Sequence, residues 1–305
     1  MTRTLILAIT AVVFGQAQQL AFREPTRPAN SPTLSVDADL VLVPVTVTDQ
    51  RGAMVRNLER ANFILTEEKE RQEIISFSRE TAPVSIGILV DFSGSMAYKI
   101  AKVRLAVDAL LDNVEPEDEG FLVTFSEAPE LRLPFTKDKE AIRQALSFAQ
   151  PLGRTALFDA VTVAVQEMRK AQNRRKVLFL ISDGGDNHSR VTKRQLRSLL
   201  DESDVQIHAI GIHDGGMSRE EVSGPWVLED LAEITGGQHH MIKDLGEIPA
   251  LAARMSLALH DRYLLGYQPT PPGPSGAFRR IEVKLVEPKG KGRLYIFARR
   301  GYIMP

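Results

Sequence analysis

The sequence predicts an α/β fold in which a doubly wound, mainly parallel sheet is inserted in, or flanked by, a small β-sandwich. Three observations predict it. The apolar run over residues 85–90 is short and continuous, as in strands that are covered on both faces. From Val84 to Arg262, strand and helix patterns alternate, which is typical of a parallel sheet with helices on both faces. Outside that range, both ends of the chain show strand patterns alone.

The first residues have the layout of a signal peptide. Arg3 precedes an apolar run over residues 5–14, and a small-x-small pattern ends at Ala17. The run is shorter than the ~20 residues that a bilayer span needs. We therefore predict a signal peptide over residues 1–17, with an uncleaved anchor as the alternative, and a proline-rich linker over residues 18–33. An exported protein is expected in the periplasm or outside the cell.

Residues 34–82 are predicted to form an N-terminal β segment. Strand patterns cover residues 38–48, 63–66 and 73–77, and the last two bracket a charged turn over residues 67–71. Pro44 indicates an edge position or a bulge, because proline cannot donate a hydrogen bond to a neighbouring strand.

The central segment, residues 83–262, carries the α/β pattern. Residues 130–135 follow the second strand too closely for a crossover, which predicts an antiparallel edge strand. The predicted parallel strands are 85–90, 119–126, 176–182, 205–211 and 238–242, and the predicted helices are 98–113, 138–149, 156–171, 192–203, 226–235 and 247–261.

Residues 263–305 are predicted to form a C-terminal β segment, with strand patterns at 263–267, 280–286 and 294–298. Neither terminal β segment alone would bury much apolar surface. We therefore expect residues 263–305 to pair with residues 34–82 in one sandwich.

The composition argues against several functions. Lys+Arg 38 and Asp+Glu 39 give a net charge of −1, which gives no reason to expect nucleic acid or an anionic membrane as a partner. The basic runs 174–176 and 299–300 are expected at solvated ends of elements. The chain has no cysteine, so it has neither a disulfide nor a lipoprotein anchor. No segment after the leader is apolar enough to be expected to span a membrane.

Oxygen-bearing side chains follow two predicted strands and precede one predicted helix. The carboxyl ends of parallel strands are where such folds bind ligands, so these side chains are expected to meet there. Five oxygen donors without Cys or His suit a hard divalent cation such as Mg²⁺ or Mn²⁺ better than zinc or copper. The alternative for the first of them is an ordinary helix cap. The donors are Asp91, Ser93, Ser95, Thr155 and Asp183.

With these residues, the central segment resembles the von Willebrand factor type A domain. The metal-ion-dependent adhesion site of that family has the pattern Asp-x-Ser-x-Ser, then a Thr, then an Asp, and all five positions are filled here. The resemblance implies a Rossmann-like fold, a bound Mg²⁺ or Mn²⁺, and a free coordination position for the carboxylate of a partner.

The same resemblance implies a role for each donor. Ser93 and Ser95 would be direct ligands, and Asp91 would act mainly through water. Thr155 and Asp183 would exchange direct contact with the ion as the site opens or closes. The implied function is an exported, metal-dependent adhesion or interaction module that binds an Asp or Glu of a protein or matrix partner.

The architecture also resembles a group of bacterial exported proteins. These have a short β segment, a type A domain and a closing β segment that ends in an Arg-Arg-Gly-Tyr-like sequence, here residues 299–302. This resemblance supports architecture and export, and it names no substrate.

Residues beside the predicted site are candidates for partner contact. Asp186, Asn187 and His188 follow Asp183 closely and are proposed as a rim, with solvent-facing loop residues as the alternative. Tyr98 and Trp226 are expected to pack in the core, with interface contacts as the alternative.

Two other functions stay open. One is a structural or assembly scaffold of the cell envelope without a metal-dependent ligand, and the other is a metal-dependent hydrolase. A haloacid-dehalogenase-type phosphatase needs a second aspartate where this chain has Ser93, and neither Ser93 nor Ser95 lies in a Gly-x-Ser-x-Gly elbow. We therefore predict no catalytic residue and no enzyme activity.

Overall fold

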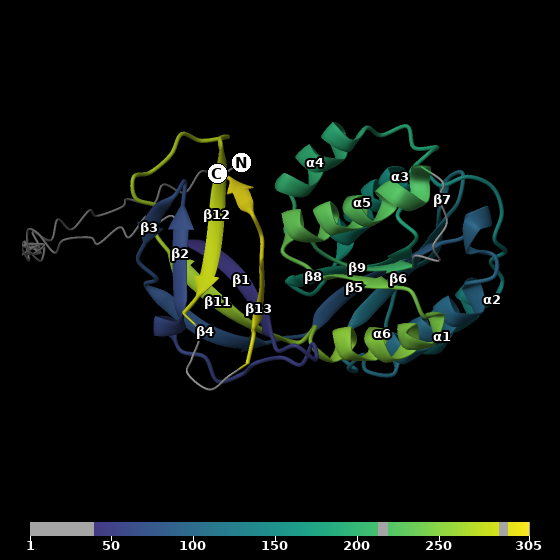
Figure 1. Cartoon of the computed structure of the whole chain (residues 1–305), viewed down its shortest axis with the longest axis horizontal. Helices are drawn as coiled ribbons and strands as arrows, with labels where there is room; N and C mark the ends of the chain where they lie inside the picture. Colours follow the sequence, from purple (N-terminus) through teal and green to yellow (C-terminus); the bar gives the residue numbers. More distant parts are fainter. Residues whose placement is uncertain (1–39, 213–218, 287–291, 305) are drawn as a thin grey trace, which may run out of the picture. The chain divides into compact units, whose positions relative to one another are not determined.

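The structure, a computed structural model, describes residues 40–212, 219–286 and 292–304. Within them the chain forms one six-stranded sheet with helices on both faces and two four-stranded sheets (Figure 1). The predicted signal peptide and linker, and the first residues of the predicted N-terminal β segment, lie outside the described residues.

The six-stranded sheet is mainly parallel. Every neighbouring pair runs parallel except β6 and β7, so β7 is the antiparallel edge strand predicted for residues 130–135. In spatial order the strands are β10 (His239–Ile242), β9 (Gln206–Ile212), β8 (Arg175–Ser182), β5 (Val84–Asp91), β6 (Glu119–Phe125) and β7 (Pro129–Thr136).

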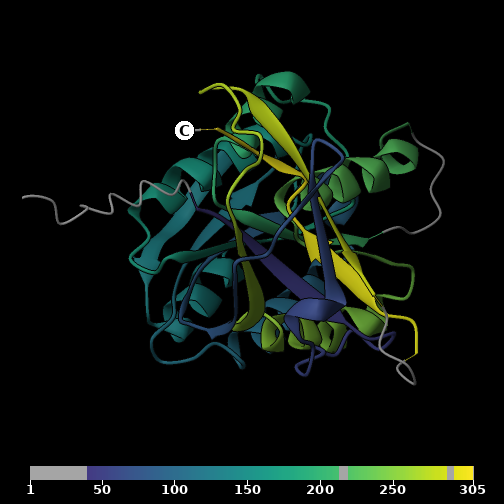
Figure 2. The same ribbon diagram turned by 90° about the vertical axis from the view of Figure 1, so that its left-hand side faces the viewer.

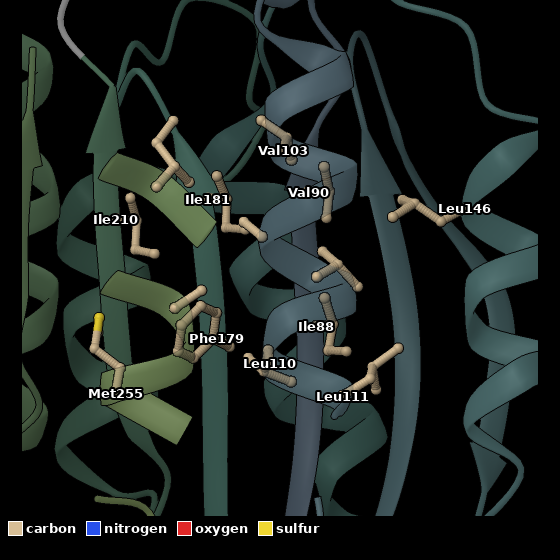
Figure 3. Packing of buried hydrophobic residues seen from close by; sticks show 14 of the residues in the cluster. Ile88, Val90, Val103, Leu110, Leu111, Leu146, Phe179, Ile181, Ile210 and Met255 are labelled. Carbon is tan, nitrogen blue, oxygen red and sulfur yellow. The ribbon is translucent and has the colours of Figure 1, made fainter. Parts of the chain in front are cut away.

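Helices cover both faces of this sheet, as the alternating pattern predicted (Figure 1). One face carries α1 (Ile100–Leu111), α2 (Lys139–Ser147) and α6 (Ile248–Leu257), and the other carries α3 (Leu157–Glu167), α4 (Lys193–Asp201) and α5 (Arg219–Thr235). Figure 3 shows the first core, where Ile88 of β5 lies beside Leu110 of α1, and Phe179 of β8 beside Met255 of α6. The doubly wound α/β class is confirmed.

Helix α5 begins earlier than the sequence predicted. The prediction started at residue 226, after Pro225, but Pro225 lies inside the helix. A proline removes one main-chain hydrogen bond from a helix, and the packing of α5 on β9 maintains the helix despite that loss. None of the helices in the described part of the chain is long and apolar enough to span a lipid bilayer.

The two remaining sheets enclose one apolar core and form a sandwich (Figure 2). Each contains strands from both ends of the chain, because β1 pairs with β11 and β2 pairs with β12, both antiparallel. One sheet has the order β13 (Tyr295–Ala298), β1 (Val41–Thr48), β11 (Asp261–Tyr267), β4 (Ser76–Thr81), and the other β14 (Gly301–Ile303), β12 (Phe278–Leu285), β2 (Phe63–Glu67), β3 (Glu70–Gln72).

Details of these strands differ from the prediction. The charged run was expected to be a turn, but β3 already begins at Glu70, and the strand predicted over residues 73–77 starts only at Ser76. The turn consists of Glu68 and Lys69, with φ angles of 50° and 76°. Two-residue hairpin turns with positive φ are normally marked by Gly or Asn, so these two residues gave no signal. Pro44 lies in the part of β1 that pairs with β11 alone.

One carboxylate is buried inside the sandwich. Glu67 accepts hydrogen bonds from the hydroxyls of Tyr267 at 2.5 Å and Tyr302 at 3.5 Å, and it forms an ion pair with Arg279. This carboxylate therefore has a buried hydroxyl partner and a cationic partner.

A second set of charges lies at the amino-terminal end of the six-stranded sheet. The carboxylate of Asp118 accepts the main-chain N–H of Val84 at 2.7 Å and lies 2.8 Å from Nε2 of His260. Arg175, expected in a solvated run, is instead buried, and its Nη2 donates to the carbonyl of Asp261 at 3.4 Å. Burial, together with the charge of Arg262, lowers the pKa of Arg175 to about 9.

Candidate metal centre

The candidate site begins at the carboxyl end of β5. Asp91 is the last residue of the strand and is buried. Its Oδ1 accepts the main-chain N–H of Ser93 at 2.8 Å, and its Oδ2 accepts the hydroxyl of Ser182 at 2.6 Å. A 3-10 turn over Gly94–Met96 follows and carries Ser95. Asp91 therefore fixes the loop on which both serines lie.

The end of β8 brings the second carboxylate to the same place. The hydroxyl of Ser95 donates to Oδ2 of Asp183 at 2.6 Å, and the hydroxyls of Ser93 and Ser95 lie 3.1 Å apart. Asp91, Ser93, Ser95 and Asp183 are thus joined by direct hydrogen bonds in one row. The sequence predicted that these four would meet at this edge, and the structure brings them together.

The loop that carries Thr155 is bonded through its main chain to the loop after β5. The carbonyl of Gly153 accepts the N–H of Gly94 at 3.0 Å, and the N–H of Leu152 donates to the carbonyl of Phe92 at 2.8 Å. These bonds hold the loop before α3 against the loop after β5. Thr155 is buried, and its main chain is held from the other side by Asn187.

The three predicted rim residues contribute differently. Asn187 accepts the N–H of Thr155 at 2.9 Å through its side chain, and its own N–H donates to the carbonyl of Thr155 at 3.0 Å. Asp186 accepts from the N–H of Phe158 at 3.3 Å. Only the side chain of His188 is left exposed without such a positioning role. Asp186 and Asn187 therefore tie the loop after β8 to the start of α3.

Two buried carboxylates, those of Asp91 and Asp183, lie close together in the site. Burial and, next, the negative charge of Asp183 raise the pKa of Asp91 to about 7, although hydrogen bonds from Ser182 and Ser93 act in the opposite direction. A cation bound beside Asp91 would lower this pKa again, because an opposite charge favours the ionised form of a carboxylate.

The donor set indicates which cation fits. Among the described residues, no group of three or more His, Cys, Asp or Glu side chains could hold a metal ion, so this site relies on hydroxyls beside its two carboxylates. Hydroxyl and carboxylate oxygens suit Mg²⁺ or Mn²⁺. The residues present therefore fit a hard divalent cation.

Comparison with known proteins bears on the same segment. Residues 86–185 match the von Willebrand factor type A domain. That range contains all five predicted ligands. The chain is also similar to a structure described as von Willebrand factor type A from Catenulispora acidiphila, with a TM-score of 0.52 and 13% identity over 86% of this chain and 74% of that one. At that identity, the similarity shows the fold alone.

Two curated proteins match part of the chain. Human inter-alpha-trypsin inhibitor heavy chain H4 is 31% identical over 136 residues, which are 40% of this chain and 15% of that protein. An uncharacterized protein of Borreliella burgdorferi (strain ATCC 35210 / DSM 4680 / CIP 102532 / B31) is 24% identical over 192 residues, 54% of this chain and 55% of that one. The chain thus spans about half or less of the length of these relatives.

A buried lysine within residues 86–185 was missed by the sequence analysis. Lys99 has a fully buried side chain, and its Nζ lies 3.6 Å from Oδ2 of Asp183. Lys99 lies just before the first residue of α1, and nothing in its spacing predicted that it would be buried. Ser182, whose hydroxyl donates to Asp91, was not predicted either.

The expectation that Tyr98 and Trp226 pack in the core is wrong. They are 61% and 71% exposed, and Leu152, on the loop before Thr155, is 77% exposed. The start of α5 approaches the site through Gly224, whose Cα hydrogen faces the main chain of Asp183 so closely that an added Cβ would lie 2.2 Å from the carbonyl oxygen. The backbone makes this contact and leaves the side chain of Trp226 outside.

Proposed function

We propose that this protein is an exported, divalent-metal-dependent binding module that holds Mg²⁺ or Mn²⁺ and binds an acidic side chain of a protein or matrix partner. The observation that carries the proposal is the row of hydrogen-bonded oxygen groups from Asp91 to Asp183 at the carboxyl end of the central sheet. The proposed ligands are Asp91, Ser93, Ser95, Thr155 and Asp183.

In such a site, the proposed ligands would have different roles. Ser93 and Ser95 offer neutral hydroxyls, and Asp91 fixes the loop that carries them. Hydroxyls neutralise less of an ion's charge than carboxylates do, so a bound Mg²⁺ would supply positive charge for a partner's Asp or Glu. The match of residues 86–185 to the type A domain supports this reading.

The surroundings support binding rather than catalysis. The two serine hydroxyls contact each other and Asp183, and no described contact joins them to a histidine that could activate them as nucleophiles. Exposed apolar side chains at Tyr98, Leu152 and Trp226 add surface for a partner, as interface anchors often do. We propose His188 as a further contact, and the periplasm or the cell exterior as the location.

The test is a calorimetric titration of the full chain with Mg²⁺ and Mn²⁺. The wild type is expected to bind, and Asp91→Asn is expected to lose binding. Asp112→Asn is the matched control, because it makes the same chemical change at an exposed position of the same unit. Equal binding by the wild type and Asp91→Asn, or no binding by the wild type, would overturn the proposed metal site.

Partner chemistry is tested with peptides. A peptide that presents one Asp and a matched peptide with Asn in its place are titrated into the Mg²⁺-loaded protein and into protein with EDTA. We expect binding of the Asp peptide only, and only with Mg²⁺. Binding that ignores either change would contradict the carboxylate-binding function.

A further inference from the structure

We propose that Lys99 is a built-in counter-charge that weakens metal binding at the candidate site and strengthens the binding of a partner's carboxylate. This inference rests on the proposed function, because it concerns the same site. It assigns a role to a residue outside the predicted ligand set.

The geometry places Lys99 on one particular oxygen. Oδ2 of Asp183 accepts the hydroxyl of Ser95 at 2.6 Å and lies 3.6 Å from Nζ of Lys99. The same oxygen therefore contacts a proposed metal ligand and a buried cation. Any neutralising effect that Asp183 has on a metal ion is shared with the lysine.

The position of Lys99 is fixed by its main chain. Its N–H donates to the carbonyl of Met96 at 2.9 Å, and its carbonyl accepts the N–H of Val103 at 3.1 Å in the first turn of α1. Both Met96 and Val103 are fully buried. The aromatic ring of Tyr98 lies 5.3 Å from Nζ. The ammonium group therefore lies between the site and an aromatic face.

The charge balance gives the consequence. When a bound cation keeps both acids ionised, Asp91 and Asp183 together supply two negative charges, and Lys99 offsets one of them. A bound divalent cation then leaves the site with a net positive charge, whereas without Lys99 the site would be neutral. Buried charges at this separation act on each other strongly, because little water screens them.

The proposal predicts opposite effects on two ligands. Lys99→Met keeps an unbranched side chain that is one atom shorter and removes its charge, so Mg²⁺ is expected to bind about tenfold more tightly. The Asp peptide is expected to bind the Mg²⁺-loaded variant about tenfold more weakly than the loaded wild type. An interaction that merely supports the fold would weaken both.

The control variants separate charge from packing. Lys102→Met removes the same charge three residues further along, at an exposed position, and is expected to leave both affinities unchanged. Lys99→Arg keeps the charge and is expected to bind Mg²⁺ nearly as the wild type does. Circular dichroism and the urea midpoint of each variant report whether it folds.

The measurement is Mg²⁺ calorimetry on the wild type, Lys99→Met, Lys99→Arg and Lys102→Met, followed by peptide titration at saturating Mg²⁺. Tighter Mg²⁺ and weaker peptide binding in Lys99→Met alone would support the inference. If the wild type binds Mg²⁺ and Lys99→Met binds it equally or more weakly, or if Lys99→Met and Lys99→Arg lose binding or folding together, the inference is overturned while the proposed function stands. Absence of Mg²⁺ binding in the wild type would instead overturn the proposed function.

Discussion

The sandwich and the central sheet each bury a carboxylate, in opposite electrostatic surroundings. Glu67, in the sandwich, is bonded to the hydroxyl of Tyr267 and paired with Arg279. Asp91, at the end of the central sheet, lies close enough to Asp183 for that second acid to raise its pKa. Burial of a carboxylate therefore does not mark a ligand site by itself. We propose that unbalanced charge around the carboxylate marks such a site, and the comparison can be tested by neutralising each acid in turn.

The largest effect is expected for Glu67→Gln. Glu67 is fully buried and Arg279 is partly exposed, so removing the carboxylate charge costs about 3 kcal/mol, the lower end for a buried ion pair. We expect the free energy of unfolding, measured with urea, to fall by about that amount. Glu130→Gln is the control, since Glu130 pairs with Arg132 at the surface and such pairs contribute little. A loss below about 1 kcal/mol in Glu67→Gln would contradict the view that Glu67 is a structural acid of the sandwich.

The backbone of the loop after β8 packs directly against the backbone of α5, so an added side-chain atom at this contact should destabilise the protein. Gly184 has a φ of +81°, and a Cβ there would lie 2.3 Å from the carbonyl oxygen of Gly224. Gly184→Ala is expected to lower the free energy of unfolding by about 2–3 kcal/mol. Gly276→Ala shares the positive φ, +77°, without a neighbour within 4 Å, so it isolates the strain from the clash. Equal losses in the two variants would argue against close packing of α5 on the site.

Asp118 offers an intermediate case, a buried carboxylate whose partner can titrate. The hydrogen bond to Asp118 raises the pKa of His260, assisted by Glu115 and opposed by burial and by Arg175. Burial alone would raise the pKa of Asp118, but the hydrogen bonds from His260, Val84 and Glu115 lower it overall.

The sign of the pH effect follows from these shifts. A raised histidine pKa adds stability that is present at low pH and lost as pH rises through that pKa, and a lowered aspartate pKa adds stability that is lost as pH falls through it. The stability difference between the wild type and His260→Gln, about 1 kcal/mol, should therefore be largest near pH 5 and shrink above pH 7. Urea midpoints across this range measure it, with His188→Gln as the exposed control. A difference that grows with pH would contradict the charged pair.

The smallest change in the free energy of unfolding is expected for Asp91→Asn in EDTA, with a tendency toward a gain where the other variants lose stability. Removing this charge relieves its repulsion with Asp183, so the free energy of unfolding should stay within about 1 kcal/mol of the wild-type value or rise. Urea unfolding of the two proteins without metal measures the change. A loss as large as that of Glu67→Gln would mean that Asp91 is a structural acid like Glu67.

The sequence predicted the central sheet well because its signals are local. Each strand and each helix of an α/β unit is one continuous run, so 85–90 could be recognised without knowing its neighbours. The sandwich was harder. β3 and β14 are only three residues long, too short to show a strand pattern of their own in the sequence.

The site was predicted as far as its residue types allowed. Asp91, the two serines and Asp183 were recognisable because their spacing follows the strands. The partners of buried charges were not recognisable in this way: in the sandwich, for example, Glu67 pairs with Arg279, 212 residues away in the chain. Lys99 was missed because a lysine near a helix start is ordinarily solvated, and only packing shows that it is buried.

The pairing of β11 with β1 and β4 has a consequence for the order in which the chain folds. The pairing with β4 alone closes a loop of roughly 180 residues, and closing such a loop in an unfolded chain costs about 4–5 kcal/mol of entropy. Once the central sheet has formed, the end of β4 and the start of β11 are held at one edge of it, and most of that cost has been met. We therefore expect the central sheet to fold first and the sandwich to assemble afterwards.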